Sequence, residues 1–553
     1  MPFLPMTKRE LQQLGWEYLD VILITGDAYV DHPSFGTAII GRVLESKGYK
    51  VGVIAQPDIN NVASFQQLGQ PRLFFGITAG NMDSMINHYT AQKKLRHNDA
   101  YSPDGISGLR PDRATIIYTN IVKRLFKGVP VVIGGIEASL RRIAHYDYWQ
   151  DKVRNSILAD SKADILIYGM GERPVCNVAD AMAAGIKIAD IQDVPSTVVF
   201  GSTPQKADND AELDSLVLPR ADLCKDRVTF YEMTQQFTEH SNSSVLYQLN
   251  GGRWIKHNPP ESALNSEDMD EIYDLPYQYA PHPIYRGKTI PAFEQIKSSI
   301  TSHRGCYGGC SFCAITCHQG KKIQSRSQAS IIKEAARLRG TISDVGGPTA
   351  NMYASRCKLG FPNSCRRRSC LFPQICPSLI MSHDEQLKLL AKISKLDGVK
   401  HVYIASGIRH DMLDNEYQYI QEIATKYTGG RLKLAPEHVS EKVLRLMGKP
   451  SIKSYEAFCD RFRKALQNSG IKRQVIPYIL IGHPGTSIED AKLLREWLIT
   501  NNIHVEQVQE FTPTPMSIST CMYYTKLDFD TGKVIEVPTP GQIREQKKMV
   551  MWK

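Results

Sequence analysis

The sequence lacks any hydrophobic run that could cross a membrane. No apolar segment approaches the roughly 20 residues that a membrane-spanning helix needs, and the start, MPFLPMTKRELQQLGWEYLD, is interrupted by proline and charged residues. A secretory signal has a continuous apolar stretch at this position, and the start is unlike one. We therefore expect a cytoplasmic protein with no membrane partner.

The sequence has no strong excess of one charge, no internal repeat of solenoid length and no low-complexity tract. The net charge is +10, but it arises from 67 basic and 57 acidic residues spread over 553 positions, which is weak evidence for a nucleic-acid partner. The densest basic run, CRRRSC at 365–370, could bind phosphate or form a solvated loop. A chain of this length and ordinary composition predicts two or more globular domains.

In the first 200 residues, short apolar segments alternate with helical ones. VILITGD is followed by TAIIGRVLESKGY, which has helical spacing, and then by the apolar KVGVIAQP. PRLFFGIT, VPVVIGGIEASL and ADILIYGMGERPV repeat the order of apolar strand, glycine turn and helix start. This alternation predicts an α/β fold with a doubly wound parallel sheet, Rossmann-like, over 1–200. The polar and proline-rich residues 201–290 are expected to form a connecting region.

A second series of strands and helices is expected over 291–525. The candidate strands are SSITSHRG, TISDVGG, HVYIASG, RLKLAPEH, QVIPYILIGHPG and VEQVQEFTP, with segments such as QASIIKEAARLRG and SIEDAKLLREWLITNN between them. Six strand-then-helix units predict a partial (β/α)6 barrel, whose chemistry gathers at the carboxyl ends of the strands. Residues 526–553 are expected to be a C-terminal tail, and their ending, EQKKMVMWK, resembles a cut edge.

Three cysteines crowd into the stretch SHRGCYGGCSFCAI, which follows the first of these strands. Cys306, Cys310 and Cys313 are interleaved with glycines that let the backbone wrap closely around a small group. Three thiolates suit an iron-sulfur cluster in which one iron stays open to a small ligand. Zinc is the competing metal; it prefers four ligands, and Cys317 or His318 could supply the fourth.

This cysteine loop, with Phe312 just before its last cysteine, resembles the signature of radical S-adenosylmethionine (SAM) enzymes. The resemblance implies a 4Fe-4S cluster on Cys306, Cys310 and Cys313, and an open iron that binds the amino and carboxylate groups of SAM. It also implies that an electron from a flavodoxin- or ferredoxin-like protein cleaves SAM. The products are methionine and a 5'-deoxyadenosyl radical, which abstracts hydrogen from a substrate.

Three later segments resemble the SAM-contacting loops of the same enzymes. DVGGPT corresponds to the loop for the amino group, although Pro348 stands where the family has an acidic residue. LAPEHVSEKVLRLMGKP resembles the ribose and carboxylate region, and YILIGHPGTSIED the segment near adenine. The candidate SAM contacts are Phe312, Gly346, Gly347, Glu437, Ser440, Gly482 and Pro484. Taken singly, these motifs are more typical of glycine turns, helix caps and core aromatics. Together, in this order after the cysteine loop, they favour contacts with SAM.

The N-terminal segments VVIGGIEASLRR and ADILIYGMGERPV are similar to the cobalamin-binding-like domain that precedes many radical SAM barrels, including Gly171 and Glu172. The cobalt-ligand motif DxHxxG is missing, because DHPSFG places His32 one residue out of step. We therefore expect the fold to be retained and cobalamin itself to be unlikely as a cofactor.

The order of these parts, together with a cysteine-rich insertion at 349–382, most closely resembles the YgiQ family of radical SAM proteins. That family has no settled substrate, so the resemblance implies a cofactor and a reaction class only. The insertion holds Cys357, Cys365, Cys370 and Cys376 at spacings that match no standard zinc knuckle. A second iron-sulfur cluster, zinc and free structural thiols all stay open. The dispersed cysteines are expected to be ordinary buried thiols: Cys176, Cys224, Cys459 and Cys521.

A second hypothesis is a metal-bound nucleic-acid binding module without catalysis. It rests on the basic balance, the CRRRSC run and the 25 tyrosines. A hybrid is an enzyme that modifies RNA as methylthiotransferases do, because VQEFTPTPMS at 508–517 resembles the end of their barrel. The appended RNA-binding domain of those enzymes is not recognisable here, so an RNA partner has little support.

Overall fold

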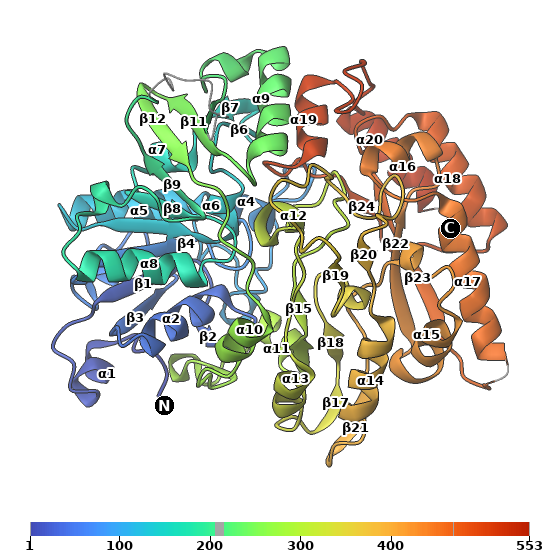
Figure 1. Ribbon diagram of the computed structural model, residues 1–553, viewed down its shortest axis with the longest axis horizontal. Coiled ribbons are helices and arrows are strands. Elements are labelled where there is room, and N and C mark those ends of the chain that lie inside the picture. The colour runs from blue at the N-terminus through green and yellow to red at the C-terminus, as the bar shows by residue number, and fades with distance from the viewer. Residues whose placement is uncertain (1, 205–214, 468, 552–553) are drawn as a thin grey trace. The chain divides into compact units, whose positions relative to one another are not determined.

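The computed structural model describes residues 2–204, 215–467 and 469–551 (Figure 1). The chain folds as two compact units, the first made of Met1–Ser262 and Glu271–Lys297 and the second of Ala263–Asp270 and Ser298–Lys553. Helix α10 (Ser266–Tyr273) contains one of the points where the chain passes between them. Within the described ranges, no helix is both long and apolar enough to cross a membrane.

The first unit is an α/β unit built on one large sheet. Its strands are β1 (Val21–Thr25), β2 (Val30–Asp31), β3 (Val51–Ala55), β4 (Phe74–Thr78), β5 (Val131–Gly134), β6 (His145–Asp147), β7 (Lys152–Arg154), β8 (Ile165–Ile167), β9 (Thr197–Phe200), β10 (Ser215–Val217), β11 (Val245–Asn250), β12 (Arg253–His257) and β13 (Ala280–Pro281). Nine of them form the sheet, in the order β10-β11-β12-β9-β8-β5-β4-β1-β3. The run from β3 to β8 is parallel throughout.

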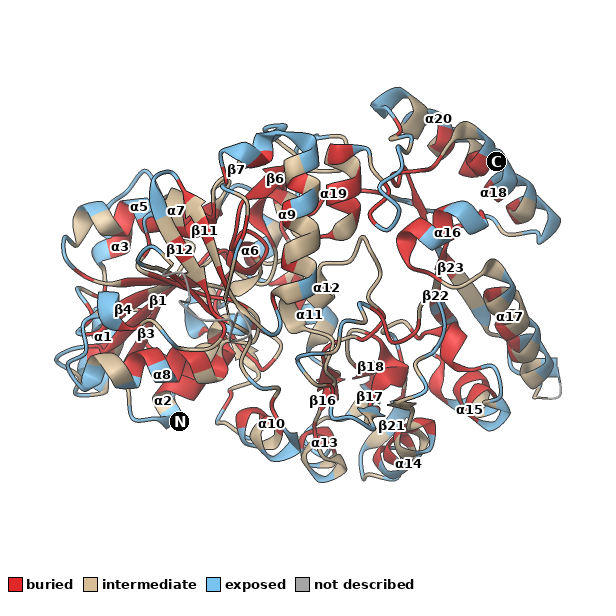
Figure 2. Ribbon diagram, turned by 45° about the horizontal axis from the view of Figure 1, so that its top comes forward, coloured by how far each residue is buried: buried red, intermediate tan, exposed pale blue. Residues whose placement is uncertain are grey.

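Helices cover both faces of this sheet, which explains why its parallel strands are continuous apolar runs such as VILIT in β1. The helices are α1 (Lys8–Gln13), α2 (Gly36–Ser46), α3 (Ala63–Gln66), α4 (Ser84–His88), α5 (Ala114–Leu125), α6 (Gly135–Ser139), α7 (Ile157–Ser161), α8 (Glu172–Ala183), α9 (Arg227–His240) and α11 (Pro291–Ile296). Helix α2 packs with α8, and α5 packs with α7. The two pairs lie on opposite sides of the buried strands (Figures 1 and 2).

The structure differs from the predicted boundaries at the end of this unit. Described residues of 201–290, expected to be a connecting region, supply β10, β11 and β12 to the same sheet. Strands β9, β12 and β11 pair antiparallel beside the parallel run. In β11 the burial alternates along VLYQLN, as expected for a strand with one covered face. That polar alternation explains why the sequence was interpreted as a linker.

The second unit has parallel strands whose neighbours follow chain order. Its strands are β14 (Ser299–Thr301), β15 (His303–Arg304), β16 (Gln324–Ser325), β17 (Gly340–Ile342), β18 (Asp344–Gly346), β19 (Arg356–Cys357), β20 (Leu379–Ile380), β21 (Val399–Val402), β22 (Arg431–Glu437), β23 (Gln474–Ile481) and β24 (Gln509–Glu510). β14 pairs with β18, β17 pairs with β21, and β22, β23 and β24 pair in turn, all parallel. The carboxyl ends of these strands therefore share an edge within each paired group.

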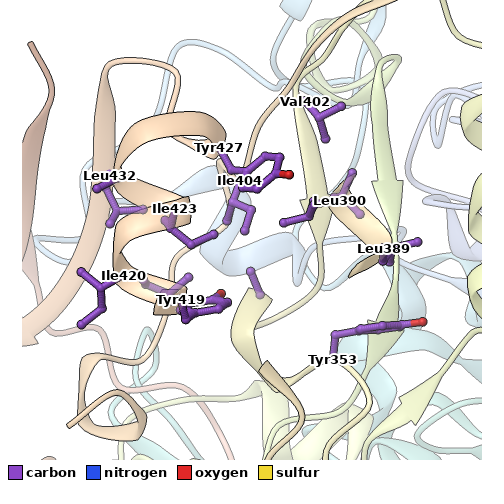
Figure 3. Packing of buried hydrophobic residues seen from close by; sticks show 14 of the residues in the cluster. Tyr353, Leu389, Leu390, Val402, Ile404, Tyr419, Ile420, Ile423, Tyr427 and Leu432 are labelled. Carbon is purple, nitrogen blue, oxygen red and sulfur yellow. The ribbon is translucent and has the colours of Figure 1, made fainter. Parts of the chain in front are cut away.

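Helices separate these strands along the chain. They are α12 (Ile315–Gln319), α13 (Gln328–Ala335), α14 (His383–Ile393), α15 (Tyr417–Glu422), α16 (Glu441–Met447), α17 (Ile452–Gln467), α18 (Ile488–Thr500), α19 (Ile518–Thr525) and α20 (Pro540–Val550). A buried cluster joins α14, α15 and α17 to strands β17, β21 and β22. Figure 3 shows Leu390 of α14, Ile404 after β21 and Leu432 of β22 within this cluster. The hydroxyl of its buried Tyr419 donates to Gln386 Oε1 at 2.8 Å, so the core hides no unpaired phenol there.

The C-terminal segment also differs from the expected tail. Helix α20 packs against α18, and its Val550 is fully buried beside Ile479 and Leu494. Thr539 and Gln542 form a capping box at its start, which satisfies backbone N–H groups that a helix otherwise leaves open. The described part of 526–553 is thus an integral layer of the second unit.

Candidate active site

The loop that carries the three clustered cysteines is closed at its base by the antiparallel pair β15 and β16. Gly305 opens it with φ +87°, and a Cβ there would lie 2.0 Å from the carbonyl oxygen of Lys322. Only glycine fits such a close approach in this conformation. The Cys306 N–H donates to the Gly320 carbonyl at 3.1 Å, so the two ends of the loop are tied together.

Cys306, Cys310 and Cys313 lie close together within this loop. The Cys313 N–H donates to the Cys310 carbonyl at 3.1 Å. Burial, and next the neighbouring Cys310 thiol, raise the pKa of Cys306, and the same two causes in the same order raise the pKa of Cys313. The loop therefore gathers thiols that require nearby positive charge or a metal to become thiolates.

Loops that follow two parallel strands contact these sulfur atoms. Thr349, after β18, places its Oγ1 3.8 Å from Cys306 Sγ. Arg409, after β21, donates from Nη1 to Cys310 Sγ at 3.2 Å. The cysteine loop is thus held at the carboxyl ends of the strands, where catalytic residues of parallel β/α folds lie.

Arg409 is the functional candidate that the sequence reasoning missed. It is buried, and its Nε and Nη2 donate to Asp411 Oδ1 and Oδ2 at 2.8 and 2.5 Å. Although burial opposes the effect, Arg409 holds the pKa of Asp411 well below its usual range. The Arg409 N–H donates to Asn351 Oδ1 at 2.8 Å, and Asn351 Nδ2 donates back to the Arg409 carbonyl at 2.9 Å. The only available signal was a basic residue soon after the strand HVYIASG.

Later strand-end segments contact the middle of the cysteine loop. The Ser311 N–H donates to the Met447 carbonyl at the end of α16, at 2.9 Å, and the Ser519 N–H in α19 donates to the Ser311 carbonyl at 2.9 Å. Phe312 packs against the cluster that contains Met447, with its ring edge-on to His483 at 6.3 Å between centroids. Phe312 therefore lies beside the GHPG segment.

Gly346 and Gly347 lie at the end of β18, and both are required by contacts within the chain. A Cβ on Gly346 would lie 1.9 Å from Ser406 Oγ, and one on Gly347 would lie 2.7 Å from the ring of His303. Asp344, just before them, accepts a hydrogen bond from the Ser406 N–H at 3.0 Å. Close packing alone accounts for both glycines, so their contact with SAM stays a prediction.

Glu437 ends β22 in a left-handed conformation, with φ +69°. Its carboxylate is buried, and Lys449 Nζ lies 3.9 Å away, which is longer than a hydrogen bond. Burial raises the pKa of Glu437, whereas Lys449 and Arg409 lower it. Two opposite charges are thus buried near each other without direct hydrogen bonding, an arrangement that is costly unless further polar partners complete it.

The remaining predicted SAM contacts engage other parts of the chain. Ser440 Oγ donates to Asp490 Oδ1 at 2.7 Å, so its hydroxyl links α16 to the start of α18. Gly482 has φ +72°, and its N–H donates to Gln546 Oε1 of α20 at 3.0 Å. The Pro484 carbonyl oxygen lies 2.8 Å from the ring nitrogen Nδ1 of the preceding histidine. The contact of Gly482 with α20 was not predicted from the sequence.

Three of the four cysteines of the insertion lie beside Cys306 of the first set. Cys306, Cys357, Cys370 and Cys376 contact the same buried cluster. Across the described residues, no three His, Cys, Asp or Glu side chains converge closely enough to hold a single metal ion. A 4Fe-4S cluster binds each thiolate at a different iron, so its ligands stand further apart than those of one ion.

The carboxyl edge of the sheet in the first unit holds a buried ionic network. Arg110 pairs with Asp27 and Asp99 at 2.9 Å each and donates to the Ala79 carbonyl at 2.8 Å. Burial raises the pKa of Asp27 to about 6. His32 is also buried there, and its Nδ1 accepts the Ser34 N–H at 3.1 Å; burial lowers the pKa of His32 to about 4.

Comparison with protein-family models defines the class. Residues 3–299 match the radical SAM N-terminal family, and residues 300–498 match the radical SAM superfamily. The chain is therefore a radical SAM enzyme, with a reaction that the match does not specify.

The UPF0313 protein YgiQ of Escherichia coli K12 is 44% identical over 586 residues, which cover 95% of this chain and 79% of that protein. A UPF0313 protein of Methanocella arvoryzae is 46% identical over 99% of this chain and 92% of its own length. One from Rhodopseudomonas palustris is 47% identical over 95% of this chain and 81% of its own length. The chain belongs to the UPF0313 family that includes YgiQ, as its motifs predicted.

Solved structures of radical SAM enzymes resemble the chain at low identity. One is the methyltransferase TsrM of Kitasatospora setae with cobalamin and a 4Fe-4S cluster bound, at 14% identity over 91% of this chain and 75% of that one, with a TM-score of 0.49. Another is the cobalamin-dependent enzyme OxsB with aqua-cobalamin bound, at 12% identity over 92% of this chain and 55% of that one, also with a TM-score of 0.49. Both of these proteins bind cobalamin, which contradicts the expectation that cobalamin is unlikely.

Proposed function

We propose that this chain cleaves SAM reductively at a 4Fe-4S cluster held by Cys306, Cys310 and Cys313, and abstracts hydrogen from a substrate. The supporting observation is that the thiol loop is the meeting point of segments that follow β18, β21, β22 and β24. The donor set fits the group, because three thiolates leave one iron open to a ligand. When bound, the cluster would supply the electron for the cleavage.

The side chains around the loop fit the zwitterionic end of SAM. Buried Glu437 and Lys449 carry opposite charges that complement an ammonium and a carboxylate. Arg409 offsets the negative charge of the thiolates and is fixed in place by Asp411. Phe312 offers an aromatic surface for adenine. Exclusion of water by the surrounding hydrophobic cluster strengthens each of these electrostatic contacts.

We also propose that the first domain is Rossmann-like and that residues 291–525 form a partial (β/α)6 barrel. The parallel bridge between Ile408 and Leu434 supports it, because it continues the chain-order pairing from β21 to β22. The insertion at 349–382 follows the end of β18.

We propose a flavodoxin- or ferredoxin-like protein as the electron donor. The cytoplasm suits an oxygen-sensitive cluster and a chain whose twelve cysteines form no disulfide within the described structure.

The test is anaerobic reconstitution with iron and sulfide, followed by measurement of 5'-deoxyadenosine formed from SAM under a strong reductant. The triple variant C306A/C310A/C313A should lose both the SAM-dependent spectroscopic change and the product. Cys224→Ala, a buried thiol in the first unit, is the matched control and should behave as wild type. Product formation by the triple variant would contradict the proposal.

The non-catalytic nucleic-acid module is not favoured by the structure. In the CRRRSC run, Arg367 donates to the Gln374 carbonyl at 2.8 Å, and Arg368 forms an ion pair with Asp530. Arg367 thus serves the loop itself and Arg368 is paired with a residue outside it, so these two guanidinium groups do not form a free row of charges for phosphate.

A further inference from the structure

The four cysteines of the insertion have no role in the proposed SAM chemistry. The insertion is closed by the pairing of β19 with β20, in which Cys357 is the partner of Leu379. The Cys376 N–H donates to the Cys370 carbonyl at 2.7 Å. These two ties bring residues from both ends of a 20-residue stretch, 357–376, to one place.

The four thiols are partly or fully shielded from solvent. Cys370 is buried, Cys357, Cys365 and Cys376 are half-buried, and all four are free. Three of them contact the cluster formed by Tyr307, Met352, Phe361, Leu371 and Met412. Three of the four cysteines are thus held against one apolar surface.

A positively charged side chain, that of Lys321, holds the loop around these thiols in place. Lys321 Nζ donates to the carbonyl oxygens of Cys365 and Arg367 at 3.0 and 2.8 Å. A cation from outside the insertion thus holds its backbone next to Cys365, and a site for several thiolates requires positive charge nearby.

The insertion is joined directly to the first cysteine loop. The Cys370 N–H donates to the Tyr307 carbonyl at 3.0 Å, and Ser369 Oγ donates to the Gly308 carbonyl at 2.7 Å. Gly309 has φ +60°, and a Cβ there would lie 2.5 Å from the Arg368 carbonyl oxygen. The backbone of the insertion therefore packs directly against the backbone of the first cysteine loop.

We propose that Cys357, Cys365, Cys370 and Cys376 ligate a second iron-sulfur cluster beside the first. Four thiolates complete the ligation of a 4Fe-4S cluster and leave no open iron. Such a closed cluster carries electrons and binds no SAM. Zinc would use the same thiolates, but the spacings of the four cysteines match no zinc knuckle.

The decisive experiment uses the full-length C306A/C310A/C313A variant, reconstituted anaerobically with iron and sulfide in the presence of zinc. The second site is intact in this variant, so it should retain about four iron and four sulfide per chain. After reduction its electron paramagnetic resonance signal should not change when SAM is added. No retained iron, or one zinc per chain in place of iron, would overturn the proposal.

The reciprocal variant is C357A/C365A/C370A/C376A, with Cys224→Ala as the control that should keep the wild-type metal content. It should lose about half of the iron while keeping the signal that responds to SAM. If it fails to fold, the first variant still decides the question. The second site is tested by the metal content of the variants, whereas the proposed function is tested by SAM cleavage in the wild type. Failure of one proposal can therefore be told apart from failure of the other.

Discussion

The contact between Arg409 and Cys310 predicts a measurable effect on the reduction potential of the proposed first cluster. Reduction adds one negative charge near a guanidinium that lies 3.2 Å from a ligand sulfur. Taking about 5 Å between the two charges and an effective dielectric constant of about 20, the interaction is about 3 kcal/mol. For one electron this corresponds to about 140 mV. Arg409→Gln should therefore lower the potential by up to this amount.

Asp411 provides an internal control for this calculation, because its Oδ2 accepts a hydrogen bond from Arg409 Nη2 at 2.5 Å. Its charge opposes that of Arg409 from about 9 Å, where the interaction is about 2 kcal/mol. The double variant R409Q/D411N should thus lie only about 60 mV below wild type, and Asp411→Asn alone should lie above it. Arg409→Lys keeps the charge and loses the two-pronged geometry, so its potential should fall between wild type and Arg409→Gln.

The assay is an anaerobic redox titration followed by electron paramagnetic resonance, on variants whose iron content equals that of wild type. Equal iron content separates the electrostatic effect from loss of the site, which matters because a lone buried Asp411 destabilises the fold by several kcal/mol. An Arg409→Gln potential equal to or above that of wild type, at full iron content, would refute the reasoning.

Three further predictions follow from single positions. Gly347→Ala places a methyl group against a buried histidine ring and should lower thermal stability by about 1–3 kcal/mol; an unchanged melting temperature would contradict the close packing. Lys449→Met and Glu437→Gln should each weaken SAM binding by about tenfold in equilibrium dialysis, while iron content stays constant; unchanged affinity would place SAM elsewhere. Burial raises the pKa of Asp27 in the folded state to about 6, from an ordinary value of 3.8, so stability from this group is full below pH 3.8 and is lost as pH rises toward 6 and above. Asp27→Asn should flatten that decline in urea unfolding, and a slope equal to that of wild type would count against it.

The cysteine loop and most strands were predictable because their signals are local. Spacing alone brings Cys306, Cys310 and Cys313 together, and alternation of apolar and helical segments gives the α/β class. Arg409 was not predictable, because its importance arises from a contact with Cys310, 99 residues away in sequence. Strands β10 to β12 were missed because they take a place at the side of a sheet, where polar side chains are tolerated.

The second set of thiols shows where sequence and structure complement each other. Spacing brings attention to Cys357, Cys365, Cys370 and Cys376, but it leaves an iron-sulfur cluster, zinc and free thiols all open. The structure adds that the same stretch is bound through its backbone to the first thiol loop and braced by Lys321.

Thiols with a purely structural role need neither of these features. Small apolar residues would pack the same space without the free-energy cost of placing a charged lysine beside them. A redox site needs both, because its charge must be balanced and its position relative to the first site must stay fixed. The metal content of the variant that lacks only the first three cysteines is therefore the measurement that separates a second cluster from a packed insertion.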